Sequence, residues 1–283
     1  MEFLNALLII LAGLLSLALL LLLLYLLVLI RPRKGVSPDP ALLCDYAHRG
    51  LHKDGIPENS LAAFERAAEA GVGIELDVQL SRDGVVMVFH DYTLTRMTGV
   101  EKKLSELTAD ELSALTLAGS EEHIPTLSEV LALVDGRVPL LVELKGEDTG
   151  TALCERLAPL LSEYTGAYCL ESFNPLLIGK MKKYLPSAFR GLLYTNVCKE
   201  KNNFSLLNRL LTAMALNFIA KPNFIAYHQG YRNSLPVRLT TRLWHAPRFT
   251  WTVRTEEELR TAHELGEHPI FEHVGGFKDN HNN

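Results

Sequence analysis

The chain has 283 residues, of which 48% are apolar, and its formal net charge at pH 7 is −5. This length supplies material for one large hydrophobic core or two small ones. The acidic balance, without a long basic block in the soluble part, argues against a nucleic-acid partner. The four cysteines lie far apart and form no C-x-x-C pair, which argues against a zinc site or a disulfide scaffold and favours a reducing compartment.

The N-terminal segment is almost entirely Leu, Ala, Ile and Val over residues 3–30. About 20 apolar residues span a bilayer, so this segment is long enough to cross it with tilt. A cleaved signal peptide is the alternative, but it has a shorter apolar region after a positive n-region, whereas here only Glu2 precedes the run. We therefore predict an uncleaved, single-pass transmembrane helix. Arg31, Arg33 and Lys34 flank its C-terminal end, so the positive-inside rule predicts a cytoplasmic domain.

Residues 31–41 contain three prolines and a glycine, and we predict a linker there from the membrane to a domain over residues 42–277. Residues 278–283 are expected to form a disordered tail. Within the domain, short apolar runs alternate with helical stretches. Strands are expected around residues 43, 74, 139, 168, 191, 225, 250 and 270. Helices are expected over residues 61–70, 127–134, 151–164, 175–184, 206–218 and 256–265.

Eight strands alternating with helices predict an α/β fold of the (β/α)8 TIM-barrel type. A doubly wound open sheet is the alternative, and it is less favoured because no Gly-rich phosphate loop follows the first strand. The connection over residues 92–136 is longer than usual and carries two short helical patterns. We interpret it as a small insertion after the hairpin of the second strand, lying over the barrel mouth.

The stretch from Gly73 to Asp91 carries the densest chemistry. Its first part alternates apolar and polar residues as a strand does, and Asp83-Gly84 suits a two-residue hairpin turn. A second strand is expected over residues 85–89, antiparallel to the first. With that turn Asp77 would pair with His90, so Glu75 and Asp77 would lie beside this imidazole at the open end of the hairpin. A bulge would shift the register by one residue.

In a barrel, catalytic groups gather at the C-terminal ends of the strands. The groups expected there are His48, Arg49, Glu75, Asp77, Glu143, Lys145, Glu171, Ser172, His228, Trp251, Arg254, Glu272 and His273. Burying so many ionisable groups without a shared task would be costly.

Glu75, Asp77 and Glu143 are all-oxygen ligands, and a hard divalent cation, Mg²⁺ or Ca²⁺, would relieve their repulsion. The alternative is three separate strand-end carboxylates paired with Arg49 and Lys145. Two histidines, His48 and His90, suit a general acid and a general base because imidazole titrates near neutral pH. Arg49 and Lys145 beside a cation would favour a phosphate ligand.

Several short motifs occur in a fixed order along the domain. They are His48-Arg49-Gly50, Pro57-Glu-Asn-Ser60, Glu75-Leu-Asp77, Ser81-Arg-Asp-Gly84, His90-Asp91, Ile124-Pro-Thr-Leu127, Glu143-Leu-Lys145, Ser172-Phe173 and Trp251-Thr-Val253. Each motif is weak alone, but the ordered set resembles the glycerophosphodiester phosphodiesterase family over nearly the whole soluble domain. The overall pattern is similar to a membrane-anchored, bacterial-type member.

The resemblance implies a TIM barrel that hydrolyses glycerophosphodiesters to glycerol 3-phosphate and an alcohol, with a role in lipid metabolism. It matches His48 and His90 to the catalytic acid and base. The remaining matches fall into two groups. Metal ligands are implied at Glu75, Asp77 and Glu143, and substrate contacts at Arg49, Lys145 and Trp251.

Two features depart from the family pattern. The last strand reads Pro269-Ile-Phe-Glu-His273 where the family often has an Ile-Ile-Thr-Asp-x-Pro-like sequence, which leaves the final contact at the rim open. Residues 196–222 form a mostly apolar helical region that either packs on the barrel or faces the membrane.

Two other functions stay open from the sequence. One is a lysophospholipase D or a phosphatidylinositol-type phospholipase that acts on membrane lipid. The other is a catalytically inactive binding protein tethered to the membrane. The expected partners are therefore a small glycerophosphodiester or a lysophospholipid, together with the membrane itself.

Overall fold

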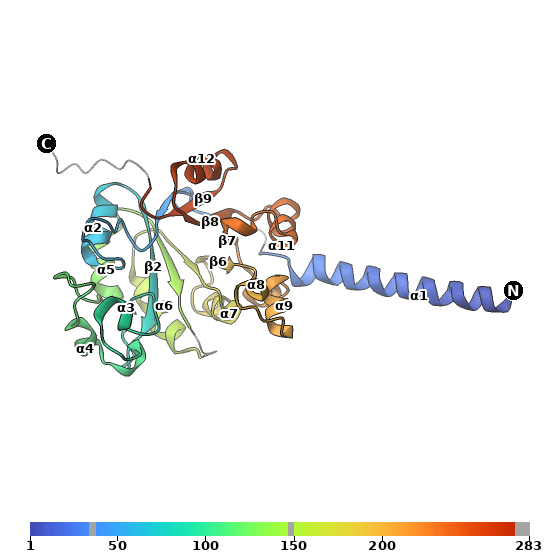
Figure 1. The fold of residues 1–283 in the computed structure, drawn as a ribbon, viewed down its shortest axis with the longest axis horizontal. Helices are drawn as coiled ribbons and strands as arrows, with labels where there is room; N and C mark the ends of the chain where they lie inside the picture. The colour runs from blue at the N-terminus through green and yellow to red at the C-terminus, as the bar shows by residue number, and fades with distance from the viewer. Residues whose placement is uncertain (34–37, 147–149, 275–283) are drawn as a thin grey trace.

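A computed structural model describes residues 1–33, 38–146 and 150–274. Within them, eight parallel strands close into a barrel in the order β1-β2-β4-β5-β6-β7-β8-β9, and β9 pairs again with β1. Strand β3 adds to the edge of β2 in the antiparallel sense. The predicted TIM barrel is confirmed (Figure 1). Part of the predicted linker and the predicted tail at 278–283 lie outside the described residues.

The described elements alternate as the sequence predicted. The strands are β1 (Tyr46–Ala47), β2 (Gly73–Leu80), β3 (Val86–Val88), β4 (Leu140–Leu144), β5 (Tyr168–Glu171), β6 (Phe189–Tyr194), β7 (Phe224–His228), β8 (Arg248–Val253) and β9 (His268–Phe271). The α-helices are α1 (Glu2–Leu24), α2 (Leu61–Glu69), α3 (Thr95–Thr98), α4 (Ala109–Ser113), α5 (Leu127–Val134), α6 (Ala152–Glu163), α7 (Pro175–Tyr184), α8 (Val197–Glu200), α9 (Leu206–Thr212), α10 (Asn217–Ala220), α11 (Leu235–Arg238) and α12 (Glu256–Glu264). Short 3₁₀ turns are η2 (Pro40–Leu42), η3 (Leu104–Glu106) and η4 (Gln229–Tyr231), and π-helical turns are η1 (Tyr25–Leu29) and η5 (Leu239–Leu243).

Aromatic rings pack inside the barrel near the start of its strands. Phe224 stacks on Phe189 with centroids 5.1 Å apart and lies 4.4 Å from the ring of Phe249. Gly191 of β6 makes room for this layer, since a Cβ there would come within 2.1 Å of the Phe224 ring. This packed layer leaves the opposite end of the strands for polar side chains.

The predicted insertion has a hydrophobic cluster of its own. Apolar side chains from β3, α3, η3 and α4 bury one another, among them Met87, Leu94, Leu104 and Leu112. Thr108 caps α4 by accepting from the Glu111 backbone at 3.3 Å, and the Thr108 backbone N–H donates to the Glu111 carboxylate at 2.8 Å. The part up to Ile124 is therefore a packed unit attached to the β2–β3 hairpin, whereas α5, at the end of the predicted insertion, packs in the main core of the barrel.

Helix α1 projects from the side of the barrel, with the N-terminus at its far end (Figure 1). With η1 it forms a 28-residue segment, Glu2–Leu29, whose best window has a mean hydropathy of 3.2 and no buried residue. It is long and apolar enough to cross a membrane, a property it shares with signal sequences. Its C-terminal end contacts the barrel. The Tyr25 hydroxyl donates to the Ala213 carbonyl at 2.9 Å, and Ile30 is fully buried against the outer barrel surface.

The hairpin register differs by one residue from the prediction. Val78 pairs with Val88 and Leu80 with Val86, so Asp77 lies opposite Phe89 and not opposite His90. The loop is Arg82–Gly84, one residue longer than expected, with Gly84 at φ +80°. The Ser81 hydroxyl explains the difference, because it donates to Asp83 at 2.6 Å and accepts from the Val85 backbone at 2.9 Å.

Two other predicted elements are interrupted. The single helix expected over residues 206–218 is two helices, α9 and α10, separated at Met214, which has φ +51° and a buried side chain. The strand expected over residues 42–47 is only Tyr46–Ala47. Asp39 caps the preceding turn by accepting from the Ala41 backbone at 2.9 Å, so the chain coils before the strand starts.

A buried network that joins β7, the segment after η4 and the residue before β9 provides a test of stability. Glu267, 3% exposed, accepts from the Tyr227 hydroxyl at 2.5 Å and from Arg232 Nε at 2.8 Å. We expect Glu267→Ala to lower the free energy of unfolding by about 3 kcal/mol, because it leaves a part-buried guanidinium and a phenol without their acceptor. Urea denaturation of the purified chain in detergent measures this change.

The matched control is Glu264→Ala on α12. Glu264 is highly exposed and lies 3.9 Å from Arg260 across a helical turn. Its removal should change the free energy of unfolding by less than about 0.5 kcal/mol. Equal losses in both variants would contradict the importance of the buried network.

Candidate active site

Three carboxylates meet inside the barrel at the C-terminal ends of β2 and β4. Asp77 pairs in register with Glu143, and Glu75 precedes Asp77 on the same face of β2. One oxygen from each carboxylate lies within 4.8 Å of the other two. All three side chains are buried. The structure thus brings together Glu75, Asp77 and Glu143, as their positions at strand ends predicted.

Two cations and an amide compensate this negative charge. Lys145 Nζ lies 3.0 Å from Asp77 Oδ1 and 2.8 Å from Glu143 Oε1. Arg49 approaches Asp77 Oδ2 with Nε at 3.4 Å, and its backbone N–H donates to Glu75 at 2.9 Å. Asn59 donates to Asp77 Oδ2 at 2.9 Å. Asp77 therefore receives most of the positive charge.

The pKa values of the three acids diverge for this reason. Burial alone would raise the pKa of Asp77, but Lys145, His90 and Arg49 hold it well below its usual range. Burial raises the pKa of Glu143 to about 7, against the opposing effect of Lys145. The pKa of Glu75 is raised well above its ordinary value by burial and by the neighbouring carboxylates.

A fourth acid, Glu171 on β5, extends the cluster. It pairs in register with Glu143, is 1% exposed, and its Oε2 has no hydrogen-bond partner among the described residues. Burial, Glu75 and Glu143 raise its pKa well above the ordinary value. A dense set of buried oxygen ligands with elevated pKa values suits a hard divalent cation, which would favour their charged forms.

The imidazole of His90 lies beside this cluster despite the changed register. Gln79 holds the returning strand by donating from one amide nitrogen to three successive carbonyls, those of Phe89, His90 and Asp91. His90 Nδ1 lies 2.7 Å from Asp91 Oδ1. Burial lowers the pKa of His90, while the nearby Asp77 carboxylate opposes that shift.

His48 directly follows β1, which pairs with β2 on the side opposite β4. Its imidazole is close enough to Asp77 for that carboxylate to affect its pKa. Burial lowers its pKa, and the charges of Arg49 and Asp77 act on it as well. The nearest carboxylate is Glu272, whose Oε2 lies 3.8 Å from His48 Nδ1. Each imidazole thus has a carboxylate on its Nδ1 side, which leaves Nε2 for a ligand.

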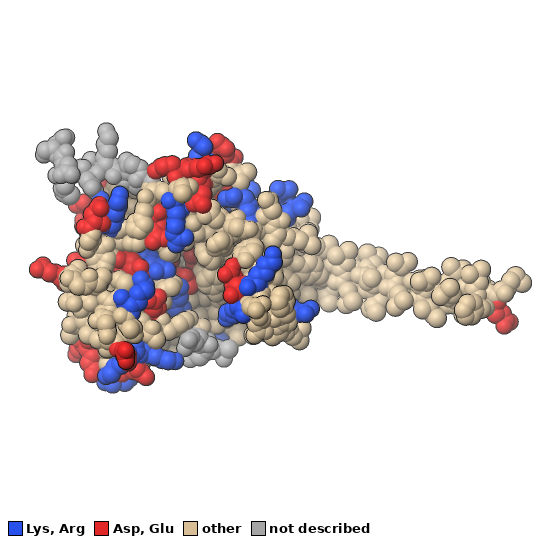
Figure 2. Space-filling view, in the orientation of Figure 1, with Lys and Arg blue, Asp and Glu red and all other residues tan. Residues whose placement is uncertain are grey.

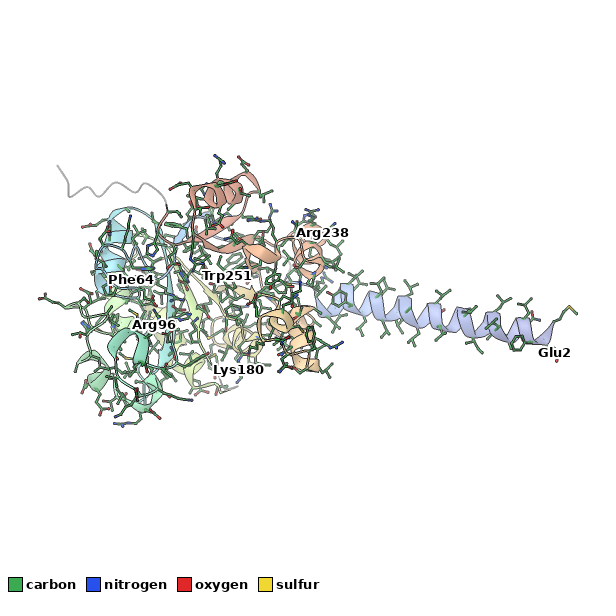
Figure 3. All side chains as sticks on the ribbon, viewed as in Figure 1. Glu2, Phe64, Arg96, Lys180, Arg238 and Trp251 are labelled. Atoms are coloured by element: carbon green, nitrogen blue, oxygen red, sulfur yellow. The ribbon has the colours of Figure 1, made fainter. Side chains whose placement is uncertain are left out.

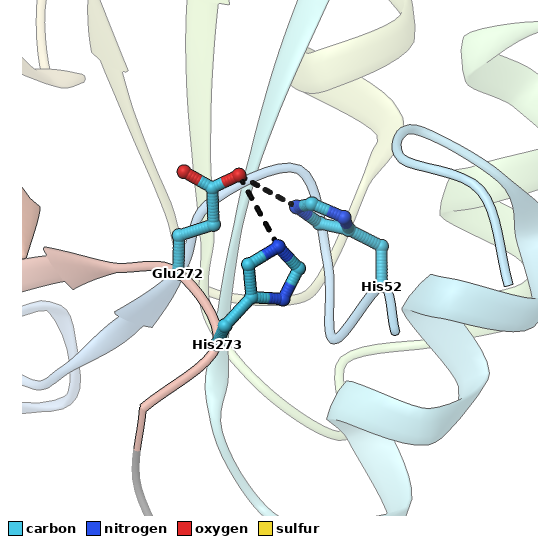
Figure 4. Close-up of side chains that lie close together, drawn as sticks. All are labelled: His52, Glu272 and His273. Carbon is cyan, nitrogen blue, oxygen red and sulfur yellow. Dashed lines mark ion pairs between the residues drawn. The ribbon is translucent and has the colours of Figure 1, made fainter. Parts of the chain in front are cut away.

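Glu272 occupies the rim position that the sequence left open. Figure 4 shows its carboxylate between His52 Nε2, at 3.7 Å, and His273 Nε2, at 3.5 Å. These three groups also have ligand atoms within 4.8 Å of one another. Arg254 Nη2 already lies 2.8 Å from Glu272, and burial lowers the pKa of His52 to about 4. We interpret this group as a support for His48 because the adjacent guanidinium opposes a second cation.

A chain of alternating charges connects the two sides of the site. Glu58 binds Arg49 at 2.7 Å and Arg96 of the insertion at 2.6 Å. Arg96 in turn lies 2.5 Å from Asp91, the partner of His90. The roles of Glu58 and Arg96 were not predicted from the sequence. Glu58 stands in the motif Pro57–Ser60, but the family resemblance implied no role for it.

Trp251 of β8, labelled in Figure 3, packs against the aromatic layer inside the barrel. Its indole N–H donates to the Ala226 carbonyl at 3.0 Å. The rings of Phe173 and His228 meet it edge-on, with centroids 5.5 and 5.1 Å away. Phe173 is partly exposed, so this aromatic group forms a half-open apolar surface.

The fold and the site define a TIM barrel with an acidic cluster that could hold a metal ion, two histidines beside it and cations suited to phosphate. Residues 48–274 match the sequence profile of the glycerophosphoryl diester phosphodiesterase family. The chain belongs to that family, whose members are phosphoric diester hydrolases that use a divalent metal.

Several known proteins are similar to the chain. A glycerophosphodiester phosphodiesterase from Caldanaerobacter subterraneus is 39% identical over 232 residues, which cover 78% of this chain and 89% of that protein. Human glycerophosphodiester phosphodiesterase 1 is 33% identical over 150 residues, or 48% of this chain and 44% of its own length.

Solved structures share the fold. A phosphodiesterase from Oleispira antarctica, in complex with the product sn-glycerol-3-phosphate, has a TM-score of 0.67 at 23% identity and covers 81% of this chain and 92% of its own. A glycerophosphodiester phosphodiesterase from Thermotoga maritima has a TM-score of 0.61 at 25% identity, covering 81% of this chain and 94% of its own.

The elevated pKa values predict pH-dependent metal binding. Protonated Glu143, with a pKa of about 7, and protonated Glu75 must lose their protons when a cation binds. Affinity for Mg²⁺ or Ca²⁺ should therefore fall as the pH is lowered from 8 to 6, by up to about tenfold per pH unit for each proton displaced. Calorimetric titration of the chelator-treated protein in two buffers measures both affinity and proton release.

Glu143→Gln is the control for this titration. It removes one of the titrating acids, so it should weaken binding and also flatten its pH dependence. An affinity that stays constant between the two pH values in the unaltered chain would contradict the proposed ligand set.

Proposed function

We propose that the chain is a metal-dependent enzyme that hydrolyses glycerophosphodiesters to glycerol 3-phosphate and an alcohol, with His48 and His90 as the acid–base pair. The observation that carries this proposal is the convergence of both imidazoles and of two other buried carboxylates, Glu75 and Glu143, on Asp77. Family membership and the name of the similar Caldanaerobacter protein support the substrate class.

Each charged group has a defined task in this proposal. Glu75, Asp77 and Glu143 hold one divalent cation, Mg²⁺ or Ca²⁺, which supplies positive charge at the phosphodiester when bound. Arg49 and Lys145 bind the non-bridging phosphate oxygens, and both are already oriented by Asp77. Trp251 offers its ring face to the apolar part of the substrate.

The two imidazoles transfer protons in two steps. One imidazole removes the proton of the glycerol 2-hydroxyl as its oxygen bonds to phosphorus. The other gives a proton to the departing alcohol as its P–O bond breaks. Water then opens the cyclic phosphate to glycerol 3-phosphate, with the proton transfers reversed. Burial lowers the pKa of both imidazoles, which favours the neutral form that the base requires, whereas Glu272 beside His48 and Asp91 beside His90 favour the protonated form that the acid requires.

We further propose that α1 is an uncleaved anchor and that the barrel lies on the cytoplasmic side. Hydrogen bonds that join this segment to the barrel support an anchor that is retained. Trp244 donates to the Leu26 carbonyl at 3.1 Å, and Asn217 donates to the Ile30 carbonyl at 2.8 Å. Arg31 and Arg33 after the helix support the cytoplasmic side.

The attached apolar helix also favours a second candidate substrate. A lysophospholipid, or a phosphatidylinositol-type lipid, would be presented to a barrel held at the bilayer. The half-open aromatic wall of Trp251 and Phe173 could accept an apolar chain. The third interpretation, an inactive tethered binding protein, is disfavoured because the complete set of acids and histidines is present.

Removal of either histidine tests the acid–base pair. His48→Ala and His90→Ala should each lower kcat by about 10²–10⁴-fold, since each loses one proton transfer. Calorimetry should show that metal binding is retained. His263→Ala is the control, because His263 is exposed and contacts only Asp45 among the described ion-pair partners, so kcat should be unchanged. Near-normal turnover in either site variant would end the assignment.

A substrate panel separates the candidate functions. Full-length protein is stripped of metal and given glycerophosphocholine or lysophosphatidylcholine, with Mg²⁺ or Ca²⁺ restored. We expect divalent-dependent release of glycerol 3-phosphate from glycerophosphocholine, because the site is lined by charged groups suited to a metal ion and a phosphate. Faster conversion of lysophosphatidylcholine to lysophosphatidate and choline would favour the phospholipase. Inactivity on both substrates would favour the binding protein.

A further inference from the structure

Positive charge is concentrated in one part of the chain. Between Glu171 and Glu256 there are 13 Lys and Arg residues and a single carboxylate, Glu200. The remaining sequence holds 15 basic and 32 acidic residues. This basic stretch includes α10 and Trp244 at the end of η5, which contact Ile30 and Leu26 in the segment that follows α1. Figure 2 shows Lys and Arg side chains around the junction between α1 and the barrel, and most acidic side chains lie farther from it.

A pocket lies at the junction between α1 and the barrel. Its volume is about 400 Å³. Arg31, Arg33, Lys182 and Lys221 supply its charged lining, and Leu27 and Val28 at the end of the apolar helix supply an adjoining hydrophobic wall. The pocket thus joins a cationic surface to the hydrophobic segment at the depth where lipid headgroups meet acyl chains.

The cations of this pocket have no carboxylate partner in the part of the chain that the structure describes. Among the described residues, no carboxylate lies within ion-pair distance of Arg31, Lys182 or Lys221. Arg31 stacks on the Trp244 ring, with its guanidinium carbon 4.8 Å from the centroid. Burial and the charges of Arg31 and Lys182 lower the pKa of Lys221. An anion bound between these groups would relieve their repulsion.

Exposed apolar side chains surround the same junction. Leu206 on α9 is 74% exposed and Leu235 on α11 is 63% exposed, and Phe204, Leu207 and Leu243 are exposed as well. Figure 3 shows Arg238 of α11 beside the point where α1 joins the barrel. Exposed leucines interspersed with Lys and Arg are typical of surfaces that lie in a membrane interface.

We propose that this junction binds the headgroup of an anionic phospholipid from the leaflet next to the barrel. The lipid phosphate lies between Arg31, Lys182 and Lys221, and an acyl chain follows Leu27 and Val28. This inference rests on the proposed role of α1 as a retained anchor. It assigns the pocket no part in catalysis, because none of its residues contacts the acidic cluster.

Native mass spectrometry of the full-length chain in detergent tests the proposal, with dioleoyl-phosphatidylglycerol as the probe and phosphatidylcholine as the comparison. We expect the unaltered chain to retain phosphatidylglycerol in preference. Lys182→Gln combined with Lys221→Gln should weaken retention about thirty-fold, since each cation near an anionic lipid contributes roughly fivefold in affinity. Lys183→Gln combined with Lys199→Gln removes the same charge outside the pocket and should change retention less than about threefold.

Three outcomes would overturn the proposal. They are equal retention of the two lipids, equal losses in the pocket and control variants, and equally tight binding of inorganic phosphate alone, which would make the ligand a soluble anion. Hydrolysis of glycerophosphocholine is measured on the same samples and should be unchanged in both variants. If the unaltered chain does not hydrolyse glycerophosphocholine, the proposed function is refuted. The lipid measurements still test the binding of phosphatidylglycerol, because they do not depend on hydrolysis.

Discussion

The repulsion among buried carboxylates at the ends of β2 and β4 is the constraint around which the site is built. Three acids within 4.8 Å of one another could not all be charged in a dry interior without compensation. Lys145 and Arg49 concentrate their charge on Asp77, so Glu75 and Glu143 keep elevated pKa values. The protein therefore neutralises only part of the charge that it buries, and the remainder is available to a cation.

The sequence predicted the barrel well because its evidence was local. The helical stretches predicted over residues 127–134 and 175–184 have the bounds of α5 and α7, and short apolar runs marked the positions of the parallel strands. The incorrect predictions depend on side-chain contacts that cannot be predicted from the periodicity of apolar residues. Ser81 lengthened the hairpin loop through its hydroxyl, and Met214 divided a helix where Tyr25, nearly 190 positions earlier, bonds to Ala213.

The same contrast between local sequence patterns and contacts among distant residues applies to the candidate site. Residues in strand-end motifs, such as Glu75 and Glu143, could be named because a barrel brings strand ends together. Glu58 and Arg96 could not, since their importance depends on one another and on a contact across the insertion. Glu272 was visible at a strand end, but only the structure shows it among three histidines and Arg254.

The contact between Glu58 and Arg96 has a consequence for how this enzyme could be altered. Arg96 belongs to α3, within a segment that has its own apolar cluster and resembles a removable module. Yet its guanidinium holds both Asp91 and Glu58, so the orientation of His90 and Arg49 depends on it. Replacing this insertion with a shorter one from a relative would preserve the barrel but misorient His90 and Arg49. The replacement would have to place a guanidinium where that of Arg96 now lies.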